Sequence, residues 1–180
     1  METDMKPSNI SELDHVDGPA NAAVTLIEYA DFECPFCVKA YAAIESVRET
    51  FRGKLRFVYR HIPKSADTGF TKQAAEAAEF AASHGQFWAM HAQLFLHPDR
   101  HDLDSLVSAA QAMGLDSAAC RKALVEKTYA GRVRAIAVEA VKSGIIGTPT
   151  LFINGTHYQD RVEQDLLRSA INHEIQAAQG

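Results

Sequence analysis

The sequence predicts an α/β fold in which helices flank a central mixed sheet. Near the N-terminus, two apolar segments typical of buried strands lie on either side of an amphipathic helix, which indicates a β-α-β unit. A long stretch with only helical patterning follows, and a β-hairpin signal and a last helix complete the pattern. The expected order is therefore β-α-β, helical insertion, β-hairpin and α.

The composition is that of an ordinary globular protein. The chain has 180 residues, of which 47% are hydrophobic and 23% are charged, and its net charge is -5. This length can bury a core without disulfides, and the 3 cysteines are too few for a disulfide scaffold. Mild acidity without a cluster of Lys or Arg argues against nucleic acid or an anionic membrane surface as a partner.

We expect residues 1–18 to form a flexible leader, because they are polar and acid-rich and are followed by Pro19. They lack the apolar core of a signal peptide, and no apolar run in the chain approaches the length of a membrane span. The expectation is a cytoplasmic protein without membrane contact. A periplasmic location is the alternative if a signal peptide has been removed.

The first β-α-β unit is read from residues 24 to 60. Residues 24–30 (VTLIEYA) are apolar apart from Glu28, as in a central strand buried on both faces. A helix is expected from about Pro35 to Arg52, with apolar residues along one stripe. Residues 55–60 (LRFVYR) alternate, and their two arginines predict a strand with one more solvated face.

Residues 65–144 are expected to form an inserted helical subdomain. Its helices are predicted at 71–84, 86–96 and 103–113, and then at 117–143 as one long helix or two abutting helices with Gly131 as the weak point. Asn154-Gly155 then predicts a tight hairpin turn between two short strands. Asp160 and Glu163 have the spacing of a capping box, which predicts the start of the last helix.

Cys34-Pro35-Phe36-Cys37 is the strongest chemical signal in the sequence. The motif follows the first predicted strand and opens the next helix, with Pro35 at the first helical position. Cys34 then lies at the helix N-terminus, where free backbone N–H groups and the helix dipole favour the thiolate. We therefore predict that Cys34 attacks a disulfide and that the more shielded Cys37 resolves the mixed disulfide. The alternative is a pair of packed or metal-binding cysteines.

These features resemble the DsbA-like family of thiol–disulfide oxidoreductases, which have a thioredoxin fold with a helical insertion. The resemblance covers about residues 20–176 and rests on the CPFC motif, the insertion and the segment GTPTLFING at 147–155. It implies a thioredoxin-like domain formed by residues 19–64 and 145–180. It also implies exchange of disulfides with protein or small-molecule thiols, and a redox partner that recycles the cysteine pair.

The resemblance further implies that the Thr148-Pro149 bond is cis and that this loop faces the cysteines. Thr148 and Pro149 would then align an extended substrate, and we place Pro35 and Phe36 in the same substrate-binding set. The alternative is a trans proline that starts a strand.

Glu28 lies where thioredoxins place a buried acid beneath the cysteine pair. Burial would raise its pKa, and the carboxylate could then accept the proton of Cys37. The alternative is a glutamate that points outward from an edge strand.

The strength of the expected oxidant depends on how well the Cys34 thiolate is stabilised. Pro35 and Phe36 bring no positive charge, and Asp31 and Glu33 lie just upstream. We therefore expect a Cys34 pKa and a redox potential intermediate between those of thioredoxins and of the strongest DsbA oxidants. The cysteine pair carries two electrons itself, so no organic cofactor or metal is expected. The direction of electron flow and the oligomeric state stay open.

Two rival functions remain. One is a glutathione-dependent enzyme of the same fold, although the intact cysteine pair argues against it. The other is a zinc-stabilised binding module that uses Cys34, Cys37 and histidines such as His97 and His101. His61 ends the second predicted strand, and its position in the sequence does not show whether it approaches the cysteines.

The remaining cysteine and the aromatic residues of the insertion are expected to be structural. Cys120 lies in a predicted helix without a partner in sequence, and free cysteines are usually buried. Aromatic residues of the insertion are expected to form its core: Phe87, Trp88 and Phe95.

Overall fold

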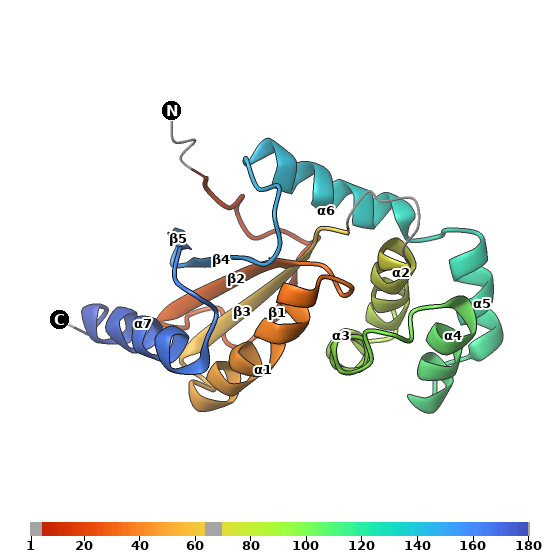
Figure 1. The fold of residues 1–180 in the computed structure, drawn as a ribbon, viewed down its shortest axis with the longest axis horizontal. Helices are drawn as coiled ribbons and strands as arrows, with labels where there is room; N and C mark the ends of the chain where they lie inside the picture. Colours follow the sequence, from red (N-terminus) through yellow and green to blue (C-terminus); the bar gives the residue numbers. More distant parts are fainter. Residues whose placement is uncertain (1–4, 64–69, 180) are drawn as a thin grey trace.

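The computed structural model describes residues 5–63 and 70–179, and a five-stranded mixed sheet lies at its centre (Figure 1). The strand order is β1-β3-β2-β4-β5. β2 and β3 are parallel, and the other neighbouring strands are antiparallel. This confirms the predicted fold class. The strands are β1 (His15–Asp17), β2 (Val24–Ala30), β3 (Leu55–His61), β4 (Thr150–Ile153) and β5 (Thr156–Tyr158).

β1 corrects the expectation that residues 1–18 form a flexible leader. His15–Asp17 pair with β3, so that His15 lies opposite Tyr59. A strand of three residues is too short to show an alternating pattern, and contacts with distant residues hold it in place. Residues 1–4 lie outside the described part of the chain.

β3 also differs from its prediction, because Arg60 is buried rather than solvated. Its side chain is 3% exposed, and Nε donates to Asp14 Oδ1 at 2.6 Å. Arg60 also donates to the hydroxyl of Tyr29. The positive charge is therefore compensated inside the protein by the segment that precedes β1.

Helices cover both faces of the sheet. α1 (Pro35–Thr50) and α7 (Gln164–Ala177) pack side by side on one face, and α6 (Ala130–Lys142) lies across the other (Figure 1). Beneath α6, apolar side chains of the sheet form a separate small core that includes Ile27, Val58 and Phe152. The N-terminal segment closes this core with Met5 and Ile10.

The inserted region extends to one side of the sheet as a group of helices (Figure 1). Phe87 and Phe95 are buried and Trp88 is partly buried, in a core that the insertion shares with the sheet and α1. Cys120 is 0% exposed, which confirms that it is packed. The predicted boundary between residues 64 and 65 lies outside the described residues. The helices are α2 (Thr71–Ala82), α3 (Phe87–Leu96), α4 (Leu103–Ala112) and α5 (Ser117–Val125).

Two helix boundaries differ from the sequence prediction. The region 117–143 is divided into α5 and α6 by residues 126–129, where Lys127 has a positive φ of 55°. Gly131 lies inside α6 and does not break it. α7 begins at Gln164 with Glu163 as its N-cap and without a side-chain capping bond, so the capping box at Asp160 is wrong. No helix among residues 5–63 and 70–179 is both long and apolar enough to cross a bilayer.

Candidate active site

The cysteine motif lies at the junction of β2 and α1, as the sequence predicts. Cys34 is the N-cap residue of α1, and Pro35 follows at the first helical position. Pro35 fits there because the first helical N–H has no partner within the helix. Both Cys34 and Cys37 are free thiols, with exposed fractions of 1% and 0%. Cys34 is thus more enclosed than an exposed nucleophile would be.

The surroundings of Cys34 favour its ionised form. Burial raises the pKa of the thiol, but hydrogen bonds from the Thr148 side chain, from the backbone and thiol of Cys37 and from the Phe36 backbone outweigh it. The pKa therefore lies below the usual 9.0. When protonated, Cys34 Sγ donates to the Thr148 carbonyl oxygen at 3.4 Å, and ionisation breaks this bond. The net effect is a thiolate that forms more readily than on an ordinary cysteine.

Cys37 has the opposite character. Burial raises the pKa of this thiol well above the usual value, and the nearby charges of Glu28 and Cys34 raise it further. The two sulfurs of one motif therefore differ in acidity, because Cys34 caps the helix and Cys37 faces the protein interior. The lowered pKa favours the thiolate of Cys34, and the raised pKa favours the thiol of Cys37.

Glu28 lies at the centre of the sheet. β2 is flanked by β3 and β4, where Glu28 is opposite Tyr59 and Leu151, so the edge-strand alternative is wrong. Its side chain is buried, and Oε1 has no hydrogen-bond partner. Burial, together with the charge of Glu45, raises the pKa of Glu28 from 4.5 to about 8. Glu28 can thus exchange a proton near neutral pH.

The loop before β4 faces the cysteines. The Thr148-Pro149 bond is cis, so the alternative of a trans proline is wrong. The contact between the Thr148 carbonyl and Cys34 Sγ joins this loop to the N-terminus of α1. Thr150 Oγ1 donates to the carbonyl of Gly147 at 2.8 Å, and this hydrogen bond stabilises the loop.

A largely apolar groove of about 930 Å³ runs beside Cys34. Phe36 and Ile146 project into solvent at its border, with exposed fractions of 71% and 84%. Of the predicted substrate-binding residues, Phe36 and Thr148 line this groove, whereas Pro35 and Pro149 do not. No pattern in the sequence predicts the contribution of α6. The Cys34 groove is lined by Cys34, Phe36, Ile62, Pro63, Arg134, Ala137, Val138, Val141, Lys142, Ile146, Gly147 and Thr148.

The two acidic residues upstream of Cys34 are engaged in hydrogen bonds. Asp31 is buried, and its Oδ1 accepts the backbone N–H of Glu33 at 2.9 Å. Glu33 Oε1 in turn accepts from the Phe70 N–H at 3.2 Å and lies 3.7 Å from Nδ1 of His101. These carboxylates therefore brace the loop between β2 and α1.

The predicted zinc ligands do not converge. Among residues 5–63 and 70–179, the single group of three or more metal-ligating side chains is His15, His61 and Glu79, and it contains no cysteine. His101 is buried, and its Nε2 contacts the carbonyl of Leu94 at 3.1 Å. Of these three residues, the sequence draws attention only to His61, because His15 and Glu79 lie at distant positions along the chain.

Comparison with known proteins identifies the family. The model of the thioredoxin family, described as "Thioredoxin", matches residues 11–173. The Na(+)/H(+) antiporter NhaA 3 of Salinispora tropica is 38% identical over 158 residues, which are 88% of this chain but 24% of that protein. NhaA 1 of Mycolicibacterium gilvum is 37% identical over 150 residues, with coverages of 82% and 24%. The chain thus spans about a quarter of these curated relatives, and their antiporter name describes the longer proteins.

Solved structures agree on the fold. BdbD from Bacillus subtilis superposes with a TM-score of 0.83 at 23% identity, covering 97% of this chain and 98% of that one. The alpha-DsbA1 protein of Wolbachia pipientis has a TM-score of 0.82 at 19% identity, with 94% of each chain covered.

A third solved structure also shares the fold. It is described as a periplasmic thioredoxin-like protein from Salmonella enterica serovar Typhimurium, and it has a TM-score of 0.71 at 21% identity over 91% of each chain. The expectation of a cytoplasmic protein therefore finds no support among these proteins. The fold predicted from the resemblance is confirmed, and the chain belongs to the thioredoxin family, with the helical insertion of DsbA-type structures.

Proposed function

We propose that this protein is a thiol–disulfide oxidoreductase that exchanges disulfides with protein substrates through Cys34 and Cys37. The observation that carries the proposal is the placement of two neighbouring thiols at one helix N-terminus, with Cys34 as the N-cap residue of α1 and Cys37 inside its first turn. Cys34 has a lowered pKa and Cys37 a raised one. Disulfide exchange needs one sulfur that attacks as a thiolate and a second that waits as a thiol.

In the reductive direction, the Cys34 thiolate attacks a substrate disulfide. One Cys34–substrate bond forms, the substrate S–S bond breaks, and the first substrate sulfur leaves as a thiolate. Cys37 then loses its proton and attacks Cys34 Sγ, which releases the second substrate sulfur and leaves a Cys34–Cys37 disulfide. Two electrons pass from the cysteine pair to the substrate, and the oxidative direction is the reverse.

We assign Glu28 as the acceptor of the Cys37 proton. Cys37 cannot attack while protonated, and burial keeps its pKa high. The charge of Glu28 acts on Cys37, and with a pKa of about 8 a minority of Glu28 is ionised at pH 7. This ionised fraction can accept the Cys37 proton and pass it on. Glu28 would be a positioning and proton-transfer residue and would not touch the substrate.

The Cys34 groove supports a protein substrate. Phe36 and Ile146 are large apolar side chains held in water beside the reactive sulfur, and an unfolded segment could cover them. The Thr148 backbone would align such a segment as an added strand, with Pro149 shaping the loop and Pro35 close to the reacting sulfurs. A redox partner of the same thiol chemistry would recycle the pair.

Turnover of an insulin disulfide by purified variants tests the roles of the cysteines. Cys34→Ser should abolish turnover, and Cys37→Ser should stop it after one step and accumulate a mixed disulfide. Cys120→Ala is the matched control and should turn over like the wild type, because Cys120 is packed in the insertion. Full activity of Cys34→Ser would contradict the proposal.

Two further measurements test the tuning of the pair. The redox potential should lie between about -270 and -120 mV, the values of thioredoxin and the DsbA oxidant, because no positive side chain lies in the motif. Glu28→Gln should slow release of the second substrate thiol by about 100-fold or more. Glu76→Gln is the control, since Glu76 is also a buried carboxyl with a raised pKa but belongs to α2. Equal rates for the two variants would exclude Glu28 as the proton acceptor.

A further inference from the structure

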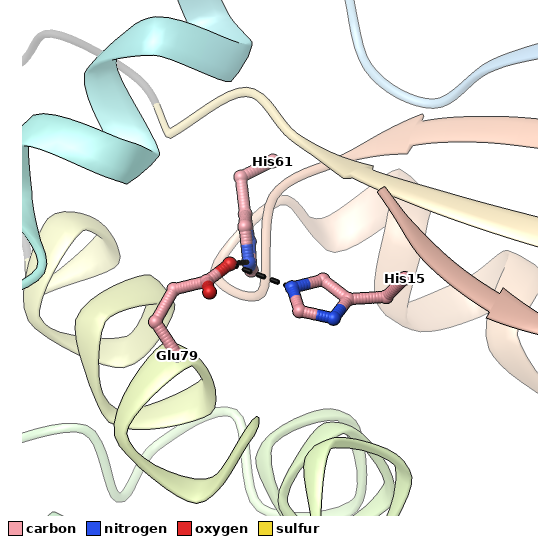
Figure 2. A group of neighbouring side chains, drawn as sticks. All are labelled: His15, His61 and Glu79. Carbon is pink, nitrogen blue, oxygen red and sulfur yellow. Dashed lines mark hydrogen bonds and ion pairs between the residues drawn. The ribbon is translucent and has the colours of Figure 1, made fainter. Parts of the chain in front are cut away.

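Three metal-ligating side chains from separate elements converge beside the sheet. His15 comes from β1, His61 from β3 and Glu79 from α2 (Figure 2). His15 Nε2 lies 2.7 Å and His61 Nε2 lies 3.0 Å from Glu79 Oε1, and the three atoms lie within 4.8 Å of one another. The three residues are buried. This is a set of two imidazole nitrogens and one carboxylate oxygen aimed at one point.

The spacing also suits a small dication. With bonds of about 2.0–2.1 Å in tetrahedral geometry, neighbouring ligand atoms are roughly 3.3 Å apart. The two nitrogen–oxygen distances of 2.7 and 3.0 Å would need to lengthen only slightly. Each imidazole now presents an Nε2 proton to the same oxygen. A metal would take the place of these two protons at Nε2, and each neutral ring would then carry its single proton on Nδ1.

Arg132 holds the carboxylate of Glu79 from the other side. Its Nε donates to Oε2 at 2.7 Å, which leaves Oε1 directed at the two histidines. The same guanidinium donates to the carbonyl oxygens of Glu12 and Leu13 at 2.9 and 3.0 Å. Such partners orient metal-binding carboxylates in known sites. The positive charge of Arg132 opposes a dication, so binding should be weaker than at structural zinc sites with four protein ligands.

We propose that His15, His61 and Glu79 form a site for a transition-metal dication, Zn²⁺ in the first place, bound through two Nε2 atoms and Oε1. Two nitrogens and one oxygen suit Zn²⁺, whereas Ca²⁺ and Mg²⁺ prefer oxygen ligands alone. With three protein ligands, a water would complete the coordination. The site is separate from the cysteines, and the proposal does not depend on the redox function.

Occupancy of this site would join β1, β3 and α2 behind the Cys34 groove. His61 is followed directly by Ile62 and Pro63, and both of these residues line the groove. A bound ion would therefore fix the wall of the groove to the N-terminal strand and to the helical insertion.

Zinc binding is measured best in a Cys34→Ser/Cys37→Ser background, because thiolates would otherwise compete for the ion. Equilibrium dialysis against micromolar ZnCl₂ should give one equivalent per chain, and excess CaCl₂ should not displace it. Added Co²⁺ should give the visible absorption of nitrogen and oxygen ligation in a four-coordinate site. His15→Gln and His61→Gln should each weaken binding at least tenfold, while the exposed His173→Gln serves as the unchanged control.

Circular dichroism of each variant identifies those that remain folded. His15→Gln carries the test if His61→Gln does not fold, because His15 lies on the short edge strand and is the most exposed member at 9%. Failure of the Cys34→Ser/Cys37→Ser protein to bind zinc, or an equivalent bound equally well by folded His15→Gln, would overturn the proposal. The three side chains would then form only a hydrogen-bonded clamp.

Discussion

Glu28 and Glu79 are two equally buried carboxyl groups with opposite charge states. Each is 2% exposed. Glu28 lies in the middle of the sheet with Oε1 unpartnered, and its pKa is raised to about 8. Glu79 lies where α2 meets β1 and β3, and its pKa is lowered. The comparison shows that burial alone does not decide whether a carboxyl group is charged.

The difference arises from the donors around each group. Glu79 accepts from His15, His61 and Arg132, so its negative charge is stabilised by three hydrogen bonds. Around Glu28, burial and the charge of Glu45 act against ionisation, and only the charge of Arg48 opposes them. Glu79 is therefore suited to stay ionised and to hold α2 against β1 and β3. Glu28 is suited to gain and lose a proton.

The largest effect on stability is expected for Glu79→Gln. Glutamine keeps one acceptor oxygen but not the negative charge, so Arg132 and the two histidines lose their anionic partner, and breaking a buried ion pair typically costs about 3–5 kcal/mol. Arg132 can turn towards water, since its side chain is 33% exposed, so the lower end of that range is expected. Urea unfolding at pH 7 measures the loss.

The pH dependence of the same variant has a definite sign. The pKa of Glu79 is lowered in the folded protein, so its stabilisation is present above the unfolded value of 4.5 and disappears as pH falls below it. The difference between wild type and Glu79→Gln should therefore shrink at acidic pH. A loss under about 1 kcal/mol at pH 7 would show that Glu79 is not the charged centre of this cluster.

Glu28→Gln should have the opposite sign. In the dithiol form at pH 7, an unfolded Glu28 is ionised while the folded group with a pKa of about 8 holds its proton. That mismatch lowers the stability of the wild type, and its removal should raise the free energy of unfolding by about 2–3 kcal/mol. The gain should vanish near pH 4.5, since the stability of the wild type falls only as pH rises from about 4.5 to about 8. A destabilised variant at pH 7 would contradict a neutral Glu28.

The sequence predicts the parts of this comparison that depend on local pattern. Glu28 stands out because it interrupts an apolar strand, and the position of Cys34 follows from a proline at the first turn of α1. The cis bond at Pro149 came from the resemblance to DsbA-like proteins, carried by the motif around it. Each of these signals is carried by residues that lie within a few positions of one another in the sequence.

The parts that the sequence missed depend on distant contacts. His15 and Glu79 are 64 positions apart, and neither belongs to a motif. Arg60 looked like a solvated strand residue because its acceptor, Asp14, lies 46 positions away. The sequence therefore does not predict β1, the donors of Glu79 or the contribution of α6 to the Cys34 groove.

Tyr29 and Tyr59 extend the comparison from carboxyl groups to hydroxyl groups, with smaller effects. Both rings are buried, with exposed fractions of 1% and 0%. The hydroxyl of Tyr29 accepts from Arg60, whereas the hydroxyl of Tyr59 has no hydrogen-bond partner. Tyr29→Phe should lower the free energy of unfolding by about 1.5–3 kcal/mol, because it removes a bond to a charged donor.

Tyr59→Phe should change stability by about 1 kcal/mol or less, and in the stabilising direction, since a buried hydroxyl without a partner is already unfavourable. Urea unfolding of both variants at pH 7 makes the measurement, and each variant is the matched control of the other because the same atom is removed. Equal losses would mean that the Tyr59 hydroxyl has a partner, and Glu28, which lies opposite Tyr59 in the sheet, would be the first group to test. A hydrogen bond between them would supply the donor that Glu28 lacks, lower the pKa of the carboxyl group, and remove the contrast with Glu79.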